Sequence, residues 1–163
     1  MDTLPIDDLD LKETIAAAVL LNNYSTTIND IAQNIYNNGL SKQSLNSVLQ
    51  SYDIEKIEQL KNELLTFMID IIKLVLNDYT ITERERKNIA LLKMYFKIKE
   101  GDFYKFKYNE IAEILNRQFE KIHEDGIVIK GEEMYKFEVQ DLFDLSYDQF
   151  LQIKEQYFNK LQE

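Results

Sequence analysis

Apolar residues recur at spacings of three and four along the first part of the chain, which is the pattern of amphipathic helices. A first helix is expected from about Asp8 to Asn23, and its predicted core residues are Leu9, Ile15, Val19 and Leu20. Ser25 is the predicted N-cap of a second helix, because its side chain can accept a bond from an exposed backbone N–H group. Gly39 stands where a left-handed helix stop is expected.

Two further helices complete the first half of the sequence. Ser41 is the predicted cap of a short third helix that carries Leu45, Val48 and Leu49. Asp53 is expected to open a long fourth helix, which buries one apolar stripe between Ile54 and Val75. Polar residues dominate between the second and the fourth helix. We therefore place the domain boundary there, with an accessory helical hairpin over residues 1–50 and the main bundle over residues 51–163; a single domain is the alternative.

The second half repeats this helical pattern. Thr82, followed three residues later by Glu85, predicts a capping box at the start of a helix. The stretch Gly101–Lys107 is predicted to be a loop or turn. Further helices are expected over about Tyr108–Glu124, near Glu132–Phe143, and after a cap at Ser146. The fold class is accordingly all-α, a compact bundle of about seven to eight helices.

Composition agrees with long helices joined by short connections. The 163 residues include one proline and four glycines, and 45% of the chain is hydrophobic. The chain has no cysteine, which excludes disulfides, thiolate metal sites and a cysteine nucleophile.

The chain is acidic, with a net charge of −10. Residues 1–81 hold 12 acidic and 5 basic side chains, and residues 82–163 hold 17 and 14. The negative net charge repels phosphate backbones, so we expect no nucleic-acid partner. The acidic start does not have the layout of a signal peptide, and the most apolar stretch, Leu64–Leu76, is too short and too often interrupted to span a bilayer. We expect a cytoplasmic protein.

Two acidic turns resemble each other. Aligning Asp78 with Asp125 also aligns Glu85 with Glu132, which Glu133 follows. Helix capping alone explains such a pattern, because aspartates accept backbone hydrogen bonds at turns and glutamates favour a first helical turn. The alternative is a divalent cation, calcium or magnesium, held by carboxylates of both turns. The second turn does not complete a calcium loop, since Lys121 and His123 occupy two of its ligand positions.

These turns, with their Asp-Gly-x-Val and Thr-x-x-Glu motifs, resemble the acidic joints of TerB-like domains, the helical family named for tellurite resistance. The stretch Asn116–Ile127 adds to the likeness, which covers about residues 54–158. The resemblance implies an all-helical bundle with pseudo-repeated helix–turn–helix halves in bacterial stress or envelope-associated assemblies. It also implies a metal site at Asp78, Glu85, Asp125, Glu132 and Glu133. Tyr79 departs from the family pattern, which has glycine there.

Basic and aromatic residues alternate around residues 95–108. A nucleic-acid strand can bind such a pattern, but in an acidic chain we interpret the rings as core and the lysines as solvated. Several rings beside one turn are difficult to bury together, so we predict a protein-binding surface there. Its residues are Phe103, Tyr104, Lys105, Phe106, Lys107 and Tyr108.

Nothing in the sequence predicts an enzyme. His123 is the only histidine, and the chain has no phosphate-binding glycine loop, nucleophile elbow or zinc-protease helix. A hydrolase would require two carboxylates that face each other across a deep cleft. The preferred hypothesis is a non-catalytic interaction or regulatory module with a protein partner. The alternative is a toxin-neutralising immunity protein or inhibitor that acts through an acidic surface. The last helix offers a homodimer face, unless its aromatic residues belong to the core: Phe150, Tyr157 and Phe158.

Overall fold

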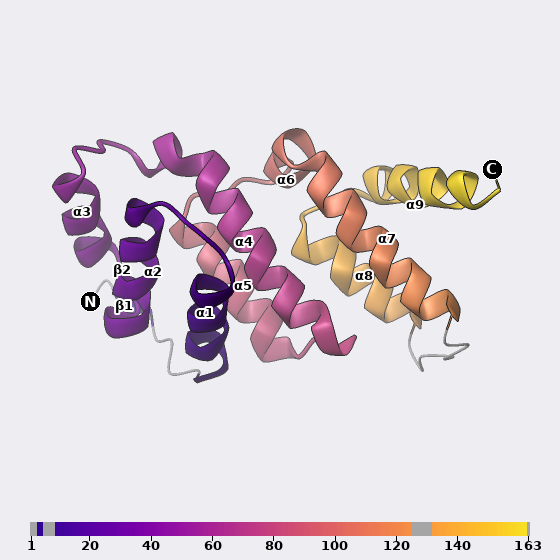
Figure 1. Cartoon of the computed structure of the whole chain (residues 1–163), viewed down its shortest axis with the longest axis horizontal. Coiled ribbons are helices and arrows are strands. Elements are labelled where there is room, and N and C mark those ends of the chain that lie inside the picture. The colour runs from indigo at the N-terminus through magenta and orange to yellow at the C-terminus, as the bar shows by residue number, and fades with distance from the viewer. Residues whose placement is uncertain (1–2, 5–8, 125–131, 163) are drawn as a thin grey trace. The chain divides into compact units, whose positions relative to one another are not determined.

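The computed structural model describes residues 3–4, 9–124 and 132–162 of the chain (Figure 1). Within these residues the fold is all-α, with nine α-helices, eight of which have seven or more residues. The predicted fold class is therefore confirmed. The chain divides into two compact units: unit 1 comprises residues 1–75 and 82–99, and unit 2 comprises residues 76–81 and 100–163.

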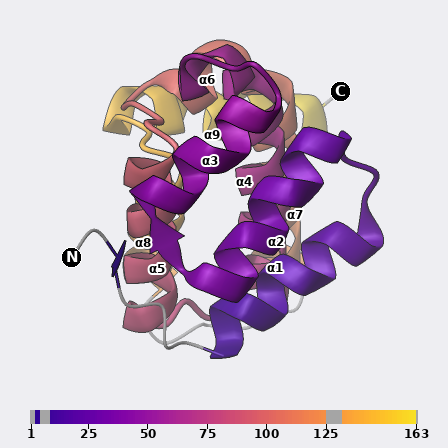
Figure 2. The same ribbon diagram turned by 90° about the vertical axis from the view of Figure 1, so that its left-hand side faces the viewer.

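The regular elements in the described part of unit 1 are helices and two strands of two residues each. The strands pair antiparallel, with Thr3 opposite Ser41 and Leu4 opposite Leu40. Helices α1 and α2 lie beside each other in both views (Figures 1 and 2). The elements of unit 1 in chain order are β1 (Thr3–Leu4), α1 (Leu9–Leu21), α2 (Thr26–Asn38), β2 (Leu40–Ser41), α3 (Lys42–Ser51), the 3-10 helix η1 (Ile57–Leu60), α4 (Lys61–Val75) and α5 (Glu83–Tyr95).

The core of unit 1 forms around α4, which packs against α1, α5 and η1. The ring of Phe67 is fully buried and meets two other rings edge-on, with centroids 5.3 Å from Tyr24 and 6.2 Å from Phe96. Edge-to-face contacts of this kind add to the gain from burial alone. The fully buried aliphatic residues of α4 are Leu64, Leu65, Met68, Ile71 and Ile72.

Unit 2 forms around α7, against which α6 and α9 both pack. Phe103 and Phe143 are fully buried, and their rings meet edge-on at 5.7 Å. Phe119 of α7 contacts Phe150 and Tyr157 of α9. The elements are the 3-10 helix η2 (Leu76–Asp78), α6 (Asp102–Phe106), α7 (Tyr108–Glu124), α8 (Glu132–Leu142) and α9 (Tyr147–Leu161).

The predicted helix caps are confirmed. The hydroxyl groups of Ser25, Ser41, Thr82 and Ser146 each accept a hydrogen bond from the backbone N–H three residues ahead. These bonds satisfy donors that a helix start leaves free. Gly39 ends α2 with a positive φ of 73°, a conformation that glycine adopts without a steric penalty.

Two predicted elements are corrected. Asp53 does not open the fourth helix, because it has a φ of 56° and closes α3 instead, with the N–H of Ile54 bonded to the carbonyl of Leu49. Helix α4 begins only at Lys61, after η1. The predicted loop Gly101–Lys107 contains the short helix α6, whose Phe103 enters the core of unit 2.

The predicted domain boundary near residue 50 lies inside unit 1, since α1 packs against both α2 and α4.

Over the described ranges, no helix combines the length and the apolar character that crossing a membrane requires.

Candidate functional site

The first predicted metal-binding turn carries hydrogen bonds of its own. Asp78 Oδ1 accepts from the backbone N–H of Thr80 at 3.1 Å, as an aspartate does at a turn. Glu85 Oε1 accepts from the N–H of Thr82 at 2.9 Å, which completes the capping box. Asp78 belongs to unit 2, whereas Glu85 belongs to unit 1. Asp78 therefore stabilises a turn and Glu85 caps a helix, and neither role requires a metal.

The second predicted turn is beyond what the structure describes, since Asp125 and the side chains of Glu132 and Glu133 lie outside the described residues. Elsewhere in the chain, the described acidic and histidine side chains form no group of three or more that could hold a metal ion. A metal site at the second turn stays a prediction.

The predicted protein-binding surface at Phe103–Tyr108 is largely used inside unit 2. Phe103 is fully buried, and Lys107 is buried as well. The hydroxyl of Tyr104 donates to Gln152 Oε1 at 2.5 Å, and that of Tyr108 donates to Gln156. These bonds join α6 and the start of α7 to α9.

Two residues of that segment remain exposed. Phe106 is 48% exposed, and the ammonium group of Lys105 lies 5.1 Å from the centre of its ring. On α9, Phe150 and Tyr157 are buried, while Phe158 is 37% exposed. Of the aromatic residues that the sequence marked for a partner, Phe103, Phe150 and Tyr157 therefore belong to the core.

A different apolar surface is open on unit 1. A groove of about 260 Å³ lies between α1 and α2. Its lining residues come from one face of each helix: Ile15, Ala16, Val19 and Leu20 of α1, and Asn29, Ala32, Gln33 and Tyr36 of α2. None of these side chains is charged, and most of the lining surface is apolar. We call this feature the α1–α2 groove.

Helix α1 is apolar on more than one side. Its residues 15–21 read Ile-Ala-Ala-Ala-Val-Leu-Leu, and a helix that is apolar all round is normally buried all round. Here Ile15 and Ala18 are buried, but Leu20 is 85% exposed and Leu21 is 69% exposed. The prediction that Leu20 is a core residue is therefore wrong. Among the described residues of unit 1, none covers this side of α1.

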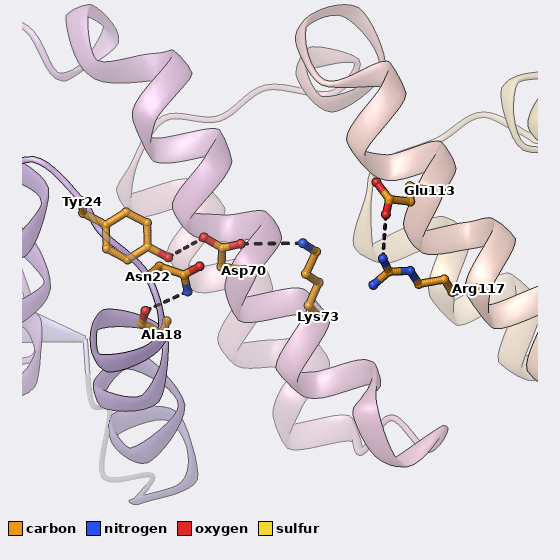
Figure 3. Close-up of polar contacts among 7 residues, drawn as sticks. All are labelled: Ala18, Asn22, Tyr24, Asp70, Lys73, Glu113 and Arg117. Atoms are coloured by element: carbon orange, nitrogen blue, oxygen red, sulfur yellow. Dashed lines mark hydrogen bonds and ion pairs between the residues drawn. The ribbon is translucent and has the colours of Figure 1, made fainter.

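The end of α1 and the start of α2 are held in place by polar contacts (Figure 3). The amide of Asn22 donates to the carbonyl of Ala18 at 2.9 Å, at the last turn of α1. The hydroxyl of Tyr24 donates to Asp70 Oδ2 of α4 at 2.5 Å, and Lys73 Nζ lies 4.0 Å from Asp70 Oδ1. These contacts anchor the connection between α1 and α2, so the groove has a defined geometry.

One polar atom at the groove is unsatisfied. The amide of Asn29 donates to the carbonyl of Tyr24 at 3.3 Å, while its Oδ1 is buried and accepts no hydrogen bond within the described chain. A buried acceptor without a donor costs free energy. The ammonium group of Lys12 lies 5.9 Å from the centre of the Tyr36 ring, at the edge of the same groove.

The buried tyrosines have structural roles. Burial, followed by the bond to Asp70, raises the pKa of Tyr24, and burial raises the pKa of Tyr95 to about 12. Burial is also the main cause that raises the pKa of Tyr135, which donates to Gln118. Each hydroxyl therefore keeps its proton at neutral pH and acts as a hydrogen-bond donor, not as a general base.

No protein-family model, curated protein or solved structure matches this chain. The resemblance to TerB-like domains accordingly stays a prediction.

Proposed function

We propose that this protein is a non-catalytic interaction module, and that the α1–α2 groove binds the apolar face of a helix from a partner protein. The observation that carries the proposal is the exposed side of α1, where Leu20 lines the groove and the neighbouring Leu21 is also exposed. Exposed apolar patches of this kind mark interaction sites, because leaving them in water costs free energy.

The chemistry of the groove favours a helix as its occupant. Two parallel rows of side chains at helical spacing form a trough, into which an amphipathic helix can insert residues at positions i, i+3 or i+4, and i+7. A charged group would lose its hydration here without meeting an opposite charge, because the lining is uncharged. The occupant therefore presents aliphatic or aromatic residues to the groove.

The charge of the chain favours a partner other than a second copy. With a net charge of −10, two copies repel each other, whereas a neutral or basic partner is attracted. The TerB-like resemblance remains part of the proposal, as an interaction module that acts in a bacterial cytoplasm. The all-helical fold is compatible with it, and the α1–α2 groove does not depend on it.

A peptide titration tests the groove. The probe is a helical peptide of about 14 residues with leucines on one face and glutamines and lysines on the other, compared with a scrambled peptide of identical composition. We expect the amphipathic peptide to shift the NMR signals of residues 15–20 and 29–36 and the scrambled peptide to leave them unchanged.

Leu20→Lys should weaken binding by about tenfold or more, the cost of losing a central apolar contact. Phe137→Lys is the matched control, because Phe137 is an exposed apolar residue of unit 2 and the change in charge is identical. Equal weakening by both variants, or equal binding of both peptides, would contradict the proposal.

A specific observation also favours the alternative, an inhibitor that acts through an acidic surface. Unit 2 holds 16 acidic and 8 basic residues, and residues 137–153 include four carboxylates and no basic side chain. Phe137 and Tyr147 in this stretch are 56% and 65% exposed. Aromatic anchors among carboxylates fit the cationic surface of a nucleic-acid-cleaving toxin.

Co-expression with a panel of nuclease toxins tests this alternative by cell growth. The alternative is supported if the wild-type chain rescues growth and the double variant, Phe137→Ala with Asp148→Lys, does not. If the wild-type chain rescues none of the toxins, or if the double variant rescues equally well, the acidic surface is not inhibitory in this way.

A further inference from the structure

Unit 1 has a cavity of about 330 Å³ that shares no lining residue with the α1–α2 groove. It lies between α3, the segment before η1, and the C-terminal end of α5. Its apolar lining consists of the exposed Met94 and four buried residues: Leu45, Leu49, Ile57 and Tyr95. The hydroxyl of Tyr95 donates to the carbonyl of Ser41 at 2.8 Å, so this ring is held in position. The volume lies at the lower end of the range of about 300–1,000 Å³ that small-molecule sites have.

Cationic side chains surround this apolar floor. Lys42, Lys56 and Lys97 line the cavity, against a single carboxylate, Glu55. In the described residues, the ammonium groups of Lys42 and Lys56 have no carboxylate within 4.0 Å. Lys97 lies 3.7 Å from Glu58, in an ion pair whose members are both exposed to solvent. The cavity is therefore locally positive in a chain of net charge −10.

Lys97 reaches the cavity through an unusual backbone conformation. It has a φ of 56° in the turn that closes α5, where the N–H of Ile98 bonds to the carbonyl of Lys93 at 2.9 Å. Glycine is the residue that adopts this left-handed conformation without a steric penalty. A lysine here is less favourable for the backbone than a glycine would be, and it adds an ammonium group to the cavity.

We infer that this cavity binds a small organic anion, a carboxylate or phosphate that carries a short apolar chain. The anionic group lies among Lys42, Lys56 and Lys97, which supply three charged donors. The apolar chain covers Leu45, Leu49 and Ile57 and removes their remaining exposed surface from water. Neither feature alone suffices: an inorganic anion leaves the floor uncovered, and a neutral alcohol leaves Lys42 and Lys56 without an opposite charge.

Four probes separate these contributions when they are titrated into the full chain and followed by NMR: octanoate, octanol, inorganic phosphate, and vesicles of phosphatidylglycerol. We expect octanoate to give saturable shifts of residues 42–49 and 94–97, and to bind more weakly at high salt. Octanol and phosphate should bind much more weakly at the same concentrations. Vesicles should not compete, because a cavity of this volume admits a free molecule and not a bilayer surface.

Variants test the role of each charge. Lys42→Gln and Lys97→Gly should each weaken octanoate binding by about fivefold, the effect of one partly exposed charge pair. Lys97→Gly should also melt at the same temperature as the wild type or higher, since glycine relieves the left-handed backbone, and this separates lost binding from lost folding. Glu55→Gln should strengthen binding. Lys87→Gln, an exposed lysine of α5 outside the cavity, is the matched control.

Several results would overturn the inference. Equal binding of octanol and octanoate would show that the lysines are not used, and equal binding of phosphate would show that the apolar floor is not used. The inference is also overturned if Lys87→Gln weakens octanoate binding as much as Lys42→Gln does. It is overturned as well if the shifts caused by octanoate map only to the α1–α2 groove. Vesicle binding with the same lysine dependence would replace the small molecule with a membrane surface.

Discussion

The substitution Tyr24→Phe removes one hydroxyl group from unit 1 and leaves the ring in place. That hydroxyl donates to Asp70 Oδ2 at 2.5 Å, and the side chain of Asp70 is only 14% exposed (Figure 3). The ring of Tyr24 lies edge-on to Phe67 with the centroids 5.3 Å apart, and phenylalanine preserves this contact. The substitution therefore isolates one hydrogen bond to a largely buried carboxylate.

The loss should be larger than that of an ordinary surface bond. A hydrogen bond to a charged group contributes about 1.5–3 kcal/mol to stability, and its removal leaves the carboxylate without this donor. Lys73 compensates little, because its side chain is half exposed and its ammonium group lies 4.0 Å from Asp70 Oδ1. We expect Tyr24→Phe to lower the free energy of unfolding by about 1.5–3 kcal/mol, and for a chain of this size each kcal/mol lowers Tm by about 2–4 °C.

Urea denaturation at pH 7, followed by circular dichroism, measures this loss. Tyr52→Phe is the matched control, because Tyr52 donates to Asp30 in the same kind of pair at the surface. We expect the control to unfold like the wild type. A loss below ~0.5 kcal/mol in Tyr24→Phe, the level of an exposed pair, would refute the argument that burial strengthens this bond. An equal loss in both variants would refute it as well.

The same hydroxyl predicts a dependence on pH. Burial and the bond to Asp70 raise the pKa of Tyr24 in the folded state, whereas the unfolded chain has the ordinary value of about 10. The stabilisation is therefore complete below about pH 10 and is lost as the pH rises above it. Wild-type stability should fall more steeply above pH 10 than that of Tyr24→Phe. Parallel pH profiles of the two proteins would contradict this assignment.

Two further outcomes test other parts of the structure. Phe103→Ala should destabilise the protein by about 3–5 kcal/mol, because it empties a fully buried site. Phe106→Ala should change stability little, because Phe106 is exposed. Similar losses of stability in urea denaturation would contradict the placement of Phe103 in the core. The TerB-like resemblance predicts that calcium or magnesium raises Tm relative to EDTA. When the free cation is at one hundred times its dissociation constant, the free energy of unfolding should rise by about 2.7 kcal/mol. Asp125→Asn with Glu132→Gln should abolish that rise, and identical melts of the wild type in every condition would end the metal hypothesis.

Helix starts could be predicted from the sequence because a cap is a local device. The hydroxyl of Thr82 accepts from the N–H of Glu85, and that of Ser146 accepts from the N–H of Gln149. Each bond joins residues only three positions apart, so both partners can be read from one short stretch of sequence. The same applies to the apolar stripe of α4, since helical spacing alone shows that these residues share one face. The all-helical fold class follows from such local patterns.

Elements whose stability comes from distant residues were predicted incorrectly. Helix α6 has five residues, too few to be stable by propensity alone, and Phe103 within it packs against Phe143 of the α8–α9 turn. Asp53 was expected to open the fourth helix, yet it adopts the left-handed conformation that closes α3. Nothing local distinguishes the two roles of an aspartate that follows one helix and precedes another.

Both candidate sites depended on the tertiary structure. The sequence by itself determined that α1 is apolar, but placed Leu20 in the core with Ile15. Which side of α1 is covered depends on α4, to which Tyr24 bonds across 46 positions of sequence. The lysines around the second cavity likewise come from three separate segments. The hydrophobic effect has no direction, so a sequence shows which residues favour burial, and only the packed neighbours decide which of them remain on the surface.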